Sequence, residues 1–241
     1  MNAMIHPWAT KAPCPDARTQ PRPALFRGLT RHEMHCIRQG FCKNLYARGE
    51  PVPLDPVQRP FVGVILSGAL REDVHDAHGA RRLFALNFAG EVLSPLGPRR
   101  AGGQLSALEE TALLTCDRAG FDALAADIPR LRLNLLHLLQ GQIAITHRWQ
   151  TLLGRKSASE RVASMVAWLH ARQGGTNELL LPVSRAELGQ MSGLTLETVS
   201  RQIRALEKAG VIAMPQPTRI HVLDADALHQ LTGDAPARHA A

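Results

Sequence analysis

The sequence contains no run of about 18 consecutive apolar residues, which excludes a membrane-spanning helix of ordinary length. Residues 1–23 also lack an apolar run of signal-peptide length. With no export signal, the chain is expected in the cytoplasm. Its four cysteines would then be thiols, metal ligands or redox sensors rather than structural disulfides. No nucleophile motif is present, and no His/Glu metal set lies on neighbouring predicted strands, so the sequence does not favour an enzyme.

The composition is that of a globular protein with an excess of basic residues. Of 241 residues, 45% are hydrophobic, which is enough for two modest domains with a core each. Lys and Arg number 28 against 21 Asp and Glu, a formal net charge of +7. Between Arg148 and Arg219 there are ten basic and five acidic residues, a local charge of +5. This balance favours a polyanionic partner, most often nucleic acid.

The first half of the chain contains three successive sequence patterns, which predict an arm, a short helix and a set of strands. Residues 1–25 are rich in Pro and Arg and are predicted to form an extended, poorly ordered arm. Residues 29–41 predict a short helix in which Thr30 and Glu33 have the spacing of a capping box. Between residues 45 and 118, short apolar runs alternate with turn residues, which predicts an antiparallel sandwich or barrel.

Residues 119–156 predict a short helix that ends before Pro129, followed by a long one. A stripe of six apolar residues and Gln142 recurs along the long helix at intervals of four and three, as in the seam of a coiled coil: Leu131, Leu135, Leu138, Gln142, Ile145, Trp149 and Leu152. A second stripe of Leu136, Leu139 and Ile143 lies beside it. One face can therefore cover the β domain while the other meets a partner helix. The alternative is a single helix buried in its own domain, but its length and regular spacing favour a homodimer.

The last third predicts a winged helix-turn-helix. Residues 157–175 form a helix that ends in glycines, and residues 183–193 form a short helix with Ser184 as N-cap and a turn at Gly193. A second helix over 194–210, capped by Thr195, precedes two short strands over 211–224. Helix, glycine turn, helix and hairpin in this order are typical of this DNA-binding motif.

One face of the second helix carries side chains that can read DNA bases. Glu197, Ser200 and Arg201 lie at i, i+3 and i+4, while Val199, Ile203 and Leu206 line the opposite face. Arg can bond guanine bidentately, and Glu can accept from the cytosine amino group. The expected DNA-binding set is Glu197, Ser200, Arg201, Thr195, Thr198 and Ser184, with the two threonines placed for phosphates. Alone, Glu and Arg at this spacing are equally an ordinary surface pair.

The stretch LPVSRAELGQMSGLTLETVSRQIRALEKAGVI resembles the C-terminal domain of the CRP/FNR transcription regulators, and its E-x-x-S-R is similar to the FNR and FixK branch. LLGRKSASERVASMVAWL resembles that branch's hinge, and GVILSGALREDVHDAHGARRLFALNFAGE resembles the family's β-roll. The resemblance implies an α+β fold: a double-stranded β-helix like that of cyclic-nucleotide-binding domains, a long dimerisation helix and a winged helix-turn-helix. It places an arm at 1–26, the sensor at 27–125, the dimerisation helix at 126–156 and the DNA-binding domain at 157–241.

The function implied by this resemblance is transcription regulation by a homodimer. Glu197, Ser200 and Arg201 would read a TTGAT-like half-site, with the inverted copy one helical turn away. Two-fold symmetry of the helical seam predicts a palindrome independently. RNA polymerase is an expected partner, and a response to oxygen, redox state or nitric oxide is implied. The competing classes are an enzyme on a cupin-like β-roll and a ligand-binding module that does not bind DNA.

The sequence leaves the sensed signal and the cofactor open. Cyclic-AMP-binding members of the family follow Gly-Glu with Arg-Ser; here Gly90 and Glu91 precede Arg99 and Arg100, without that Arg-Ser. The cluster-binding branch uses three N-terminal cysteines and a central one. Cys14 and Cys116 resemble two of the four, but Lys11 and Gln20 occupy the other positions.

Three further possibilities for the signal follow from individual residues. A rearranged iron–sulfur cluster would use Cys14, Cys36, Cys42 and Cys116. The alternative is that Cys36 and Cys42 are packing residues. Haem or another metal would use the pairs His32 with His35 or His75 with His78, and thiol oxidation would act on Cys14.

The long helix carries a negative observation of its own. No acidic residue occurs between Asp127 and Glu160. In cluster-sensing relatives, a carboxylate in this helix is understood to hold the subunits apart when the cluster is lost. Its absence here implies a dimer that persists without a cluster, as in FixK-type relatives.

Overall fold

The computed structural model describes residues 23–52, 61–75, 78–93 and 103–234. Their contacts divide the chain into two units, one up to Gln142 and one from Ile143 onward. The boundary falls inside helix α3 (Pro129–Arg155), so each unit contains part of that helix. The expected domain limits at 27, 126 and 157 stay predictions.

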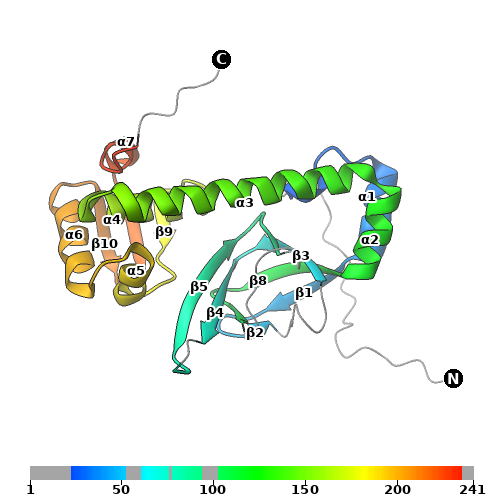
Figure 1. The fold of residues 1–241 in the computed structure, drawn as a ribbon, viewed down its shortest axis with the longest axis horizontal. Helices are drawn as coiled ribbons and strands as arrows, with labels where there is room; N and C mark the ends of the chain where they lie inside the picture. The colour runs from blue at the N-terminus through cyan, green and yellow to red at the C-terminus, as the bar shows by residue number, and fades with distance from the viewer. Residues whose placement is uncertain (1–22, 53–60, 76–77, 94–102, 235–241) are drawn as a thin grey trace, which may run out of the picture. The chain divides into compact units, whose positions relative to one another are not determined.

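The first unit consists of two antiparallel sheets with short helices at the ends of the chain segment that forms them. Its elements are η1 (Ala24–Phe26), α1 (Arg31–Gly40), β1 (Cys42–Tyr46), β2 (Pro51–Val52), β3 (Phe61–Ser67), β4 (Ala69–His75), β5 (Arg81–Phe88), β6 (Val92–Leu93), β7 (Gln104–Ala107), β8 (Thr111–Asp117) and α2 (Arg118–Asp127). One sheet has the order β1-β8-β3-β6 and the other the order β2-β7-β4-β5. Figure 1 labels β1, β3 and β8 of the first sheet and β2, β4 and β5 of the second. The predicted sandwich-like β domain is confirmed.

Local sequence signals explain the ends of these elements. The Thr30 hydroxyl accepts from the Glu33 amide at 3.2 Å, and the Glu33 carboxylate accepts from the Thr30 amide at 2.6 Å, so the predicted capping box is present. Gly79 has a φ of 76° between β4 and β5, as the predicted hairpin turn requires, although residues 76–77 of that turn lie outside the described ranges.

Two buried clusters form the core of the first unit. The interior between the sheets holds Tyr46, Val52, Ile65, Leu70, Leu93, Leu105, Ala107 and Leu113. The second cluster joins η1, α1, α2 and the start of α3 to the outer side of β3 and β8. Asn134 of α3 fixes the η1 segment, because its amide donates to the Leu25 carbonyl at 2.9 Å and to the Arg27 carbonyl at 2.8 Å.

Helix α3 turns a different face inward from the one expected. Leu131 and Leu135 are 0% and 6% exposed and belong to the second core cluster of the first unit, so almost none of their surface remains for a partner helix. The N-terminal residues and the sheet cover that face, and the place of these two residues in a dimer seam stays a prediction. By contrast, Leu136 and Ile143 of the second stripe are 52% and 56% exposed.

The remaining apolar positions of the predicted seam are also buried or half-buried within the chain. Leu138 packs against the core of the first unit, and Leu152 is buried in the second. Ile145 is half-buried, and the Trp149 ring meets the Trp168 ring edge-on with centroids 5.4 Å apart. The predicted stripe therefore serves mainly intramolecular packing.

The second unit is a small helical domain with a three-stranded sheet. It contains α4 (Ala158–Arg172), β9 (Glu178–Leu180), α5 (Arg185–Ser192), α6 (Leu196–Lys208), β10 (Ile212–Gln216), β11 (Arg219–Val222) and α7 (Ala225–Gln230). The strands have the order β10-β11-β9, and α4, α5 and α6 pack against one another (Figure 1). The predicted winged helix-turn-helix is confirmed.

Candidate nucleic-acid interface

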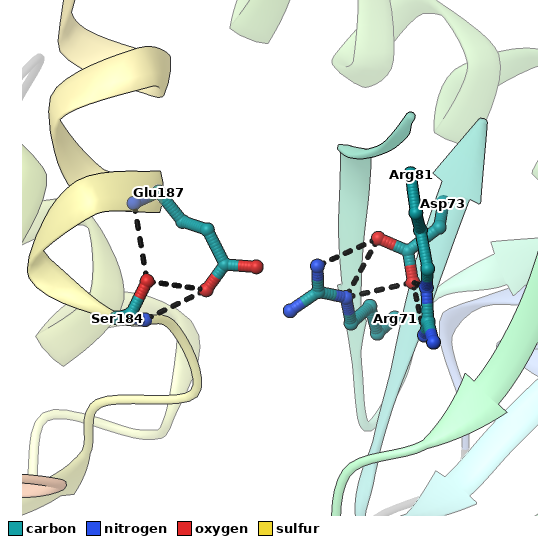
Figure 2. Close-up of polar contacts among 5 residues, drawn as sticks. All are labelled: Arg71, Asp73, Arg81, Ser184 and Glu187. Carbon is teal, nitrogen blue, oxygen red and sulfur yellow. Dashed lines mark hydrogen bonds and ion pairs between the residues drawn. The ribbon is translucent and has the colours of Figure 1, made fainter. Parts of the chain in front are cut away.

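Helix α5 begins with a reciprocal cap at Ser184. Figure 2 shows the Glu187 amide donating to the Ser184 hydroxyl at 3.2 Å, and the Glu187 carboxylate accepting from the Ser184 amide at 2.8 Å and from its hydroxyl at 2.9 Å. Such a box satisfies amide groups that lack partners in the first helical turn. Ser184 is thus the N-cap that the sequence predicts, and its place in the DNA-binding set stays a prediction.

The turn between α5 and α6 depends on two glycines. Gly193 ends α5 with φ 64° and ψ 38°, the left-handed conformation that glycine adopts without a steric penalty. At Gly189 a Cβ atom would lie 2.6 Å from the Leu194 carbonyl oxygen, so a larger residue would force the turn apart. Sequence reasoning identified Gly193 and missed Gly189, because the close approach at Gly189 is visible only once the helices cross.

Helix α6 begins at the predicted cap. The Thr195 hydroxyl accepts from the Thr198 amide at 3.2 Å and donates to the Thr198 hydroxyl at 3.1 Å, so the two threonines are paired with each other. Glu197 lies in the first turn, where its own backbone amide and the Thr195 hydroxyl lower the pKa of its carboxyl group. Its side chain is therefore negatively charged at neutral pH.

The two faces of α6 are divided as predicted. Val199 and Ile203 are fully buried and Leu206 is nearly so, which anchors the inner face. On the outer side, Glu197 and Arg201 are exposed and Ser200 is half-buried. Within the described part of the chain, Arg201 makes neither a hydrogen bond nor an ion pair, so Arg201 and Glu197 are not joined as a surface pair. A guanidinium without an internal partner remains available for an external one.

The outer face of α6 continues beyond the predicted triplet. Arg204 and Lys208 follow Arg201 at intervals of three and four and are both exposed. The outer face of α6 therefore carries an acidic residue, Glu197, in its first turn and basic residues afterwards. Sequence reasoning did not single out these two residues, although the same spacing argument finds them. Positive charge along this face suits phosphate contacts beside the base-reading positions.

The hairpin of β10 and β11, called the wing, is bonded to α6 and to β9. The Met214 amide of β10 donates to the Glu207 carboxylate at 3.1 Å, and Arg219 of β11 pairs with Glu178 of β9. The tip between β10 and β11 is exposed, and a register shift occurs between Ala213 and Gln216. These contacts hold the wing beside the outer face of α6 without using the residues of that face.

The three described cysteines lie on β8, β1 and α1. Cys116 is buried in β8, and burial, with smaller contributions from Asp117 and Cys42, raises the pKa of its thiol to about 12. Cys42 is exposed at the start of β1, and Cys36 is half-buried on α1. Among the residues that the structure describes, no three His, Cys, Asp or Glu side chains come close enough to bind one metal ion. Cys14 lies outside those residues.

These observations bear on an iron–sulfur cluster, whose irons require thiolate ligands. Among the described residues, Cys36, Cys42 and Cys116 do not form a group that could hold a metal ion, whereas a cluster needs several thiolates at one place. The described residues therefore do not fit such a group. Of the other candidates, His32 and His35 are exposed on α1, with His35 beside Gln39 at 3.1 Å, and Arg99 and Arg100 lie outside the described ranges.

An ion cluster within the β domain escaped sequence reasoning. Asp73 of β4 is fully buried, and Figure 2 shows its carboxylate between two guanidinium groups. Arg71 lies 2.7 Å from one carboxylate oxygen and Arg81 of β5 lies 2.5 Å from the other. A register shift between Glu72 and Asp73 lets both acidic residues turn inward. The cluster ties β4 to β5.

Among the described residues, no helix is long and apolar enough to cross a bilayer.

Comparisons with known proteins support the reading of both units. A Crp-like helix-turn-helix domain family matches residues 160–231. Over 192 residues the chain is 31% identical to the nitrogen fixation regulation protein FixK of Azorhizobium caulinodans, covering 78% of this chain and 77% of that protein. Over 199 residues it is 28% identical to the transcriptional activator protein FnrL of Cereibacter sphaeroides, covering 78% and 79%.

The same similarity appears among solved structures. FixK2 from Bradyrhizobium japonicum superposes with a TM-score of 0.68 at 26% identity, covering 81% of this chain and 98% of FixK2. A CRP/FNR family regulator from Thermus thermophilus superposes with a TM-score of 0.60 at 19% identity, which supports the fold. The chain belongs to the CRP/FNR family, in its FNR/FixK-like branch, and is therefore a DNA-binding transcription regulator and not an enzyme.

Proposed function

We propose that this regulator acts as a homodimer on a TTGAT-like palindrome, with Glu197, Ser200 and Arg201 of α6 reading the bases of each half-site. The observation that carries the proposal is the outer face of α6, where Glu197 and Arg201 are exposed and unpaired with each other. Thr195, Thr198 and Ser184 are assigned to the phosphates beside them. The exposed Arg201 guanidinium has no hydrogen bond or ion pair with a described residue and can therefore meet a base edge.

Base reading is tested with fluorescence anisotropy on a labelled TTGAT palindrome and on versions with single base-pair changes. Arg201→Ala should lose about 1–3 kcal/mol of discrimination at one base pair and keep it elsewhere. Arg204→Ala is the matched control on the same face. It should weaken binding to all sequences alike and reduce the slope of log affinity against log salt by about one. Unchanged sequence preference in the Arg201 variant would count against the assignment.

The dimer is proposed to form along the exposed face of α3. Leu136 and Ile143 lie seven residues apart on one helix, each more than half exposed, and Leu133 lies one turn before them. Heptad spacing of exposed aliphatic side chains is typical of a helix–helix seam. We propose the domain limits that the family resemblance implies: sensor 27–125, dimerisation helix 126–156 and DNA-binding domain 157–241, with residues 1–26 as an arm.

Sedimentation velocity of aerobically purified protein tests the dimer. Because no carboxylate lies between Asp127 and Glu160, we expect a dimer without any cluster, and a predominant monomer would contradict this. Ile143→Glu should shift the population to monomer, because it places a charge within the seam. Leu223→Glu, at an exposed leucine outside α3, is the control and should leave the dimer intact.

The signal is proposed to be oxygen, redox state or nitric oxide, with RNA polymerase as the partner at the promoter and the cytoplasm as the location. Support comes from relatives named as a fumarate nitrate reduction regulatory protein and an electron transport regulator. The competing proposals are a rearranged cluster that includes Cys14 and a haem- or ligand-responsive regulator. An anaerobic absorption spectrum with iron and sulfide analysis distinguishes cluster, haem and neither.

A further inference from the structure

Arg161 of α4 contacts three separate segments of the second unit, near the start of α6, which we call the reading helix. The Arg161 guanidinium of α4 donates from Nη2 to the Leu153 carbonyl at 2.8 Å, from Nε to the Lys156 carbonyl at 2.9 Å, and from Nη1 to the Ser192 carbonyl at 3.2 Å. These carbonyls belong to the last turn of α3, the connection to α4 and the last residue of α5. Each of the three nitrogen atoms of one planar group thus donates to a backbone carbonyl.

The chemistry of these carbonyls explains why an arginine is suited to this place. The last carbonyls of a helix have no intrahelical partner, and positive charge is favourable at a helix C-terminus. Here the ends of α3 and α5 share one cation. The guanidinium holds its donors in a rigid fork, whereas a lysine ammonium is a single flexible point. Arg161 therefore fixes two helix ends at a set distance from each other.

The turn that leads into the reading helix rests on the same group. A Cβ atom at Gly193 would lie 3.4 Å from Arg161 Nη1 and 3.5 Å from Leu153 Cδ2, so the turn is in contact with Arg161 and with α3. Helix α6 starts at Leu196, only three residues later. The N-terminal end of α6, which carries Glu197, is thereby placed relative to the end of α3.

The connection between α3 and α4 is held from its other side by Lys156. Its ammonium donates to the Ser164 hydroxyl at 2.8 Å and pairs with Asp234 at 2.6 Å, with a side chain that is mostly buried. The junction is not a loose linker that could absorb a displacement of α6. Displacement of the Ser192–Gly193 turn from the last turn of α3 would break the contacts of Arg161.

This geometry has a consequence for the operator, which rests on the proposed dimer along α3 and on the proposed half-site. In a two-fold dimer joined along α3, the distance between the two reading helices depends on where each α6 lies relative to its own α3. We propose that Arg161 is the positioning residue that sets the spacing of half-sites that the dimer accepts. It acts through the Ser192–Gly193 turn and touches no base.

The experiment measures binding to a series of TTGAT palindromes whose half-sites are separated by different numbers of base pairs. Wild type, Arg161→Lys, Arg161→Gln and Arg155→Gln are compared by fluorescence anisotropy. Arg155 is the matched control, because it is exposed at the end of α3 and makes no hydrogen bond or ion pair with any described residue. Each variant is also measured on palindromes with one changed base pair per half-site.

Wild type should prefer one spacing. Both Arg161 variants should lose about tenfold in affinity at that spacing and much less at spacings one base pair away, so that their profile is flatter. Discrimination between half-site sequences should stay as in wild type. Arg155→Gln should keep the wild-type profile. If Arg161→Lys and Arg161→Gln give the same spacing profile, the geometry of the guanidinium donors matters rather than the positive charge. If Arg161→Gln fails to fold, Arg161→Lys alone provides the test.

Each other outcome has a definite meaning. An equal loss of affinity at every spacing shows that Arg161 only stabilises the domain and overturns the inference, as does an unchanged profile; either leaves the proposed function intact. A wild-type protein that binds no palindrome of the series refutes the proposed function and this inference with it.

Discussion

The buried carboxylate of Asp73 allows a sharp test of what holds the β domain together. Asp73 is completely buried and lies 2.7 Å from Arg71 and 2.5 Å from Arg81, two arginines on the paired strands β4 and β5. The substitution Asp73→Asn preserves the size of the side chain and removes its charge. Two cationic groups would then face a neutral amide, which has one acceptor oxygen where the carboxylate had two.

The expected loss follows from the exposure of the partners. Breaking a buried ion pair by removing one partner costs about 3–5 kcal/mol. The Arg81 side chain is 52% exposed and can regain water, whereas that of Arg71 is only 16% exposed, so we expect the lower end, about 3 kcal/mol. Asp122→Asn is the matched control, since it removes an exposed i,i+4 partner of Arg118 and should cost about 0.3–0.5 kcal/mol.

Amide hydrogen exchange detected by mass spectrometry measures this loss separately in each unit. In Asp73→Asn, peptides from β3 and β8 should exchange about 100-fold faster, the equivalent of about 3 kcal/mol, while peptides from α4 keep their wild-type rate. If β3 and β8 in this variant exchange no faster than in Asp122→Asn, the ion cluster does not stabilise the domain and the reasoning is refuted.

Three further predictions concern single groups. With an exposed side chain, Cys42 should be alkylated readily in the native protein, whereas Cys116, with its pKa near 12, should be modified only after unfolding; peptide mapping distinguishes the two. Because the pKa of Glu197 is lowered, its charged carboxylate stabilises α6 at pH values above the unfolded pKa of 4.5, and this effect is lost only as pH falls through the folded pKa. The ratio of DNA dissociation constants for wild type and Glu197→Gln should therefore stay constant between about pH 6 and pH 8. Gly193→Ala should destabilise the second unit by about 1–2 kcal/mol in urea unfolding because of its positive φ, whereas Gly154→Ala in the helical end of α3 should stabilise it by about 0.5–1 kcal/mol.

Helix ends were predictable because their causes are local. Thr30, Ser184 and Thr195 each accept from an amide three residues ahead, so the cap and its partner are contained within four consecutive residues. The outer face of α6 was predictable for the same reason, since helical spacing alone separates Arg201 from Ile203. The strand β9 is only three residues long and owes its place to pairing with β11, a contact that no local pattern announces.

The orientation of α3 shows where local reasoning ends. Periodicity identified both apolar stripes of the helix, yet it could not tell which one faces inward. That depends on Leu25 and Phe26, more than a hundred residues earlier, which pack against Leu131 and Leu135 and leave Ile143 outside. Both stripes satisfy the same spacing rule, so only the tertiary contacts distinguish a core stripe from a candidate seam.

The same distinction applies to the two proposed properties of α6, its base preference and its position on the operator. The side chains that we propose to meet base edges are set by spacing within one helix, and the sequence alone identifies the face that carries them. The position of that helix depends on Arg161, which reaches the Ser192 carbonyl 31 residues away and resembles any other arginine in a basic stretch of sequence. Two regulators with the same E-x-x-S-R can therefore prefer the same half-site and still differ in the operators they accept, because base preference is local to α6 and half-site spacing is a property of the junction behind it.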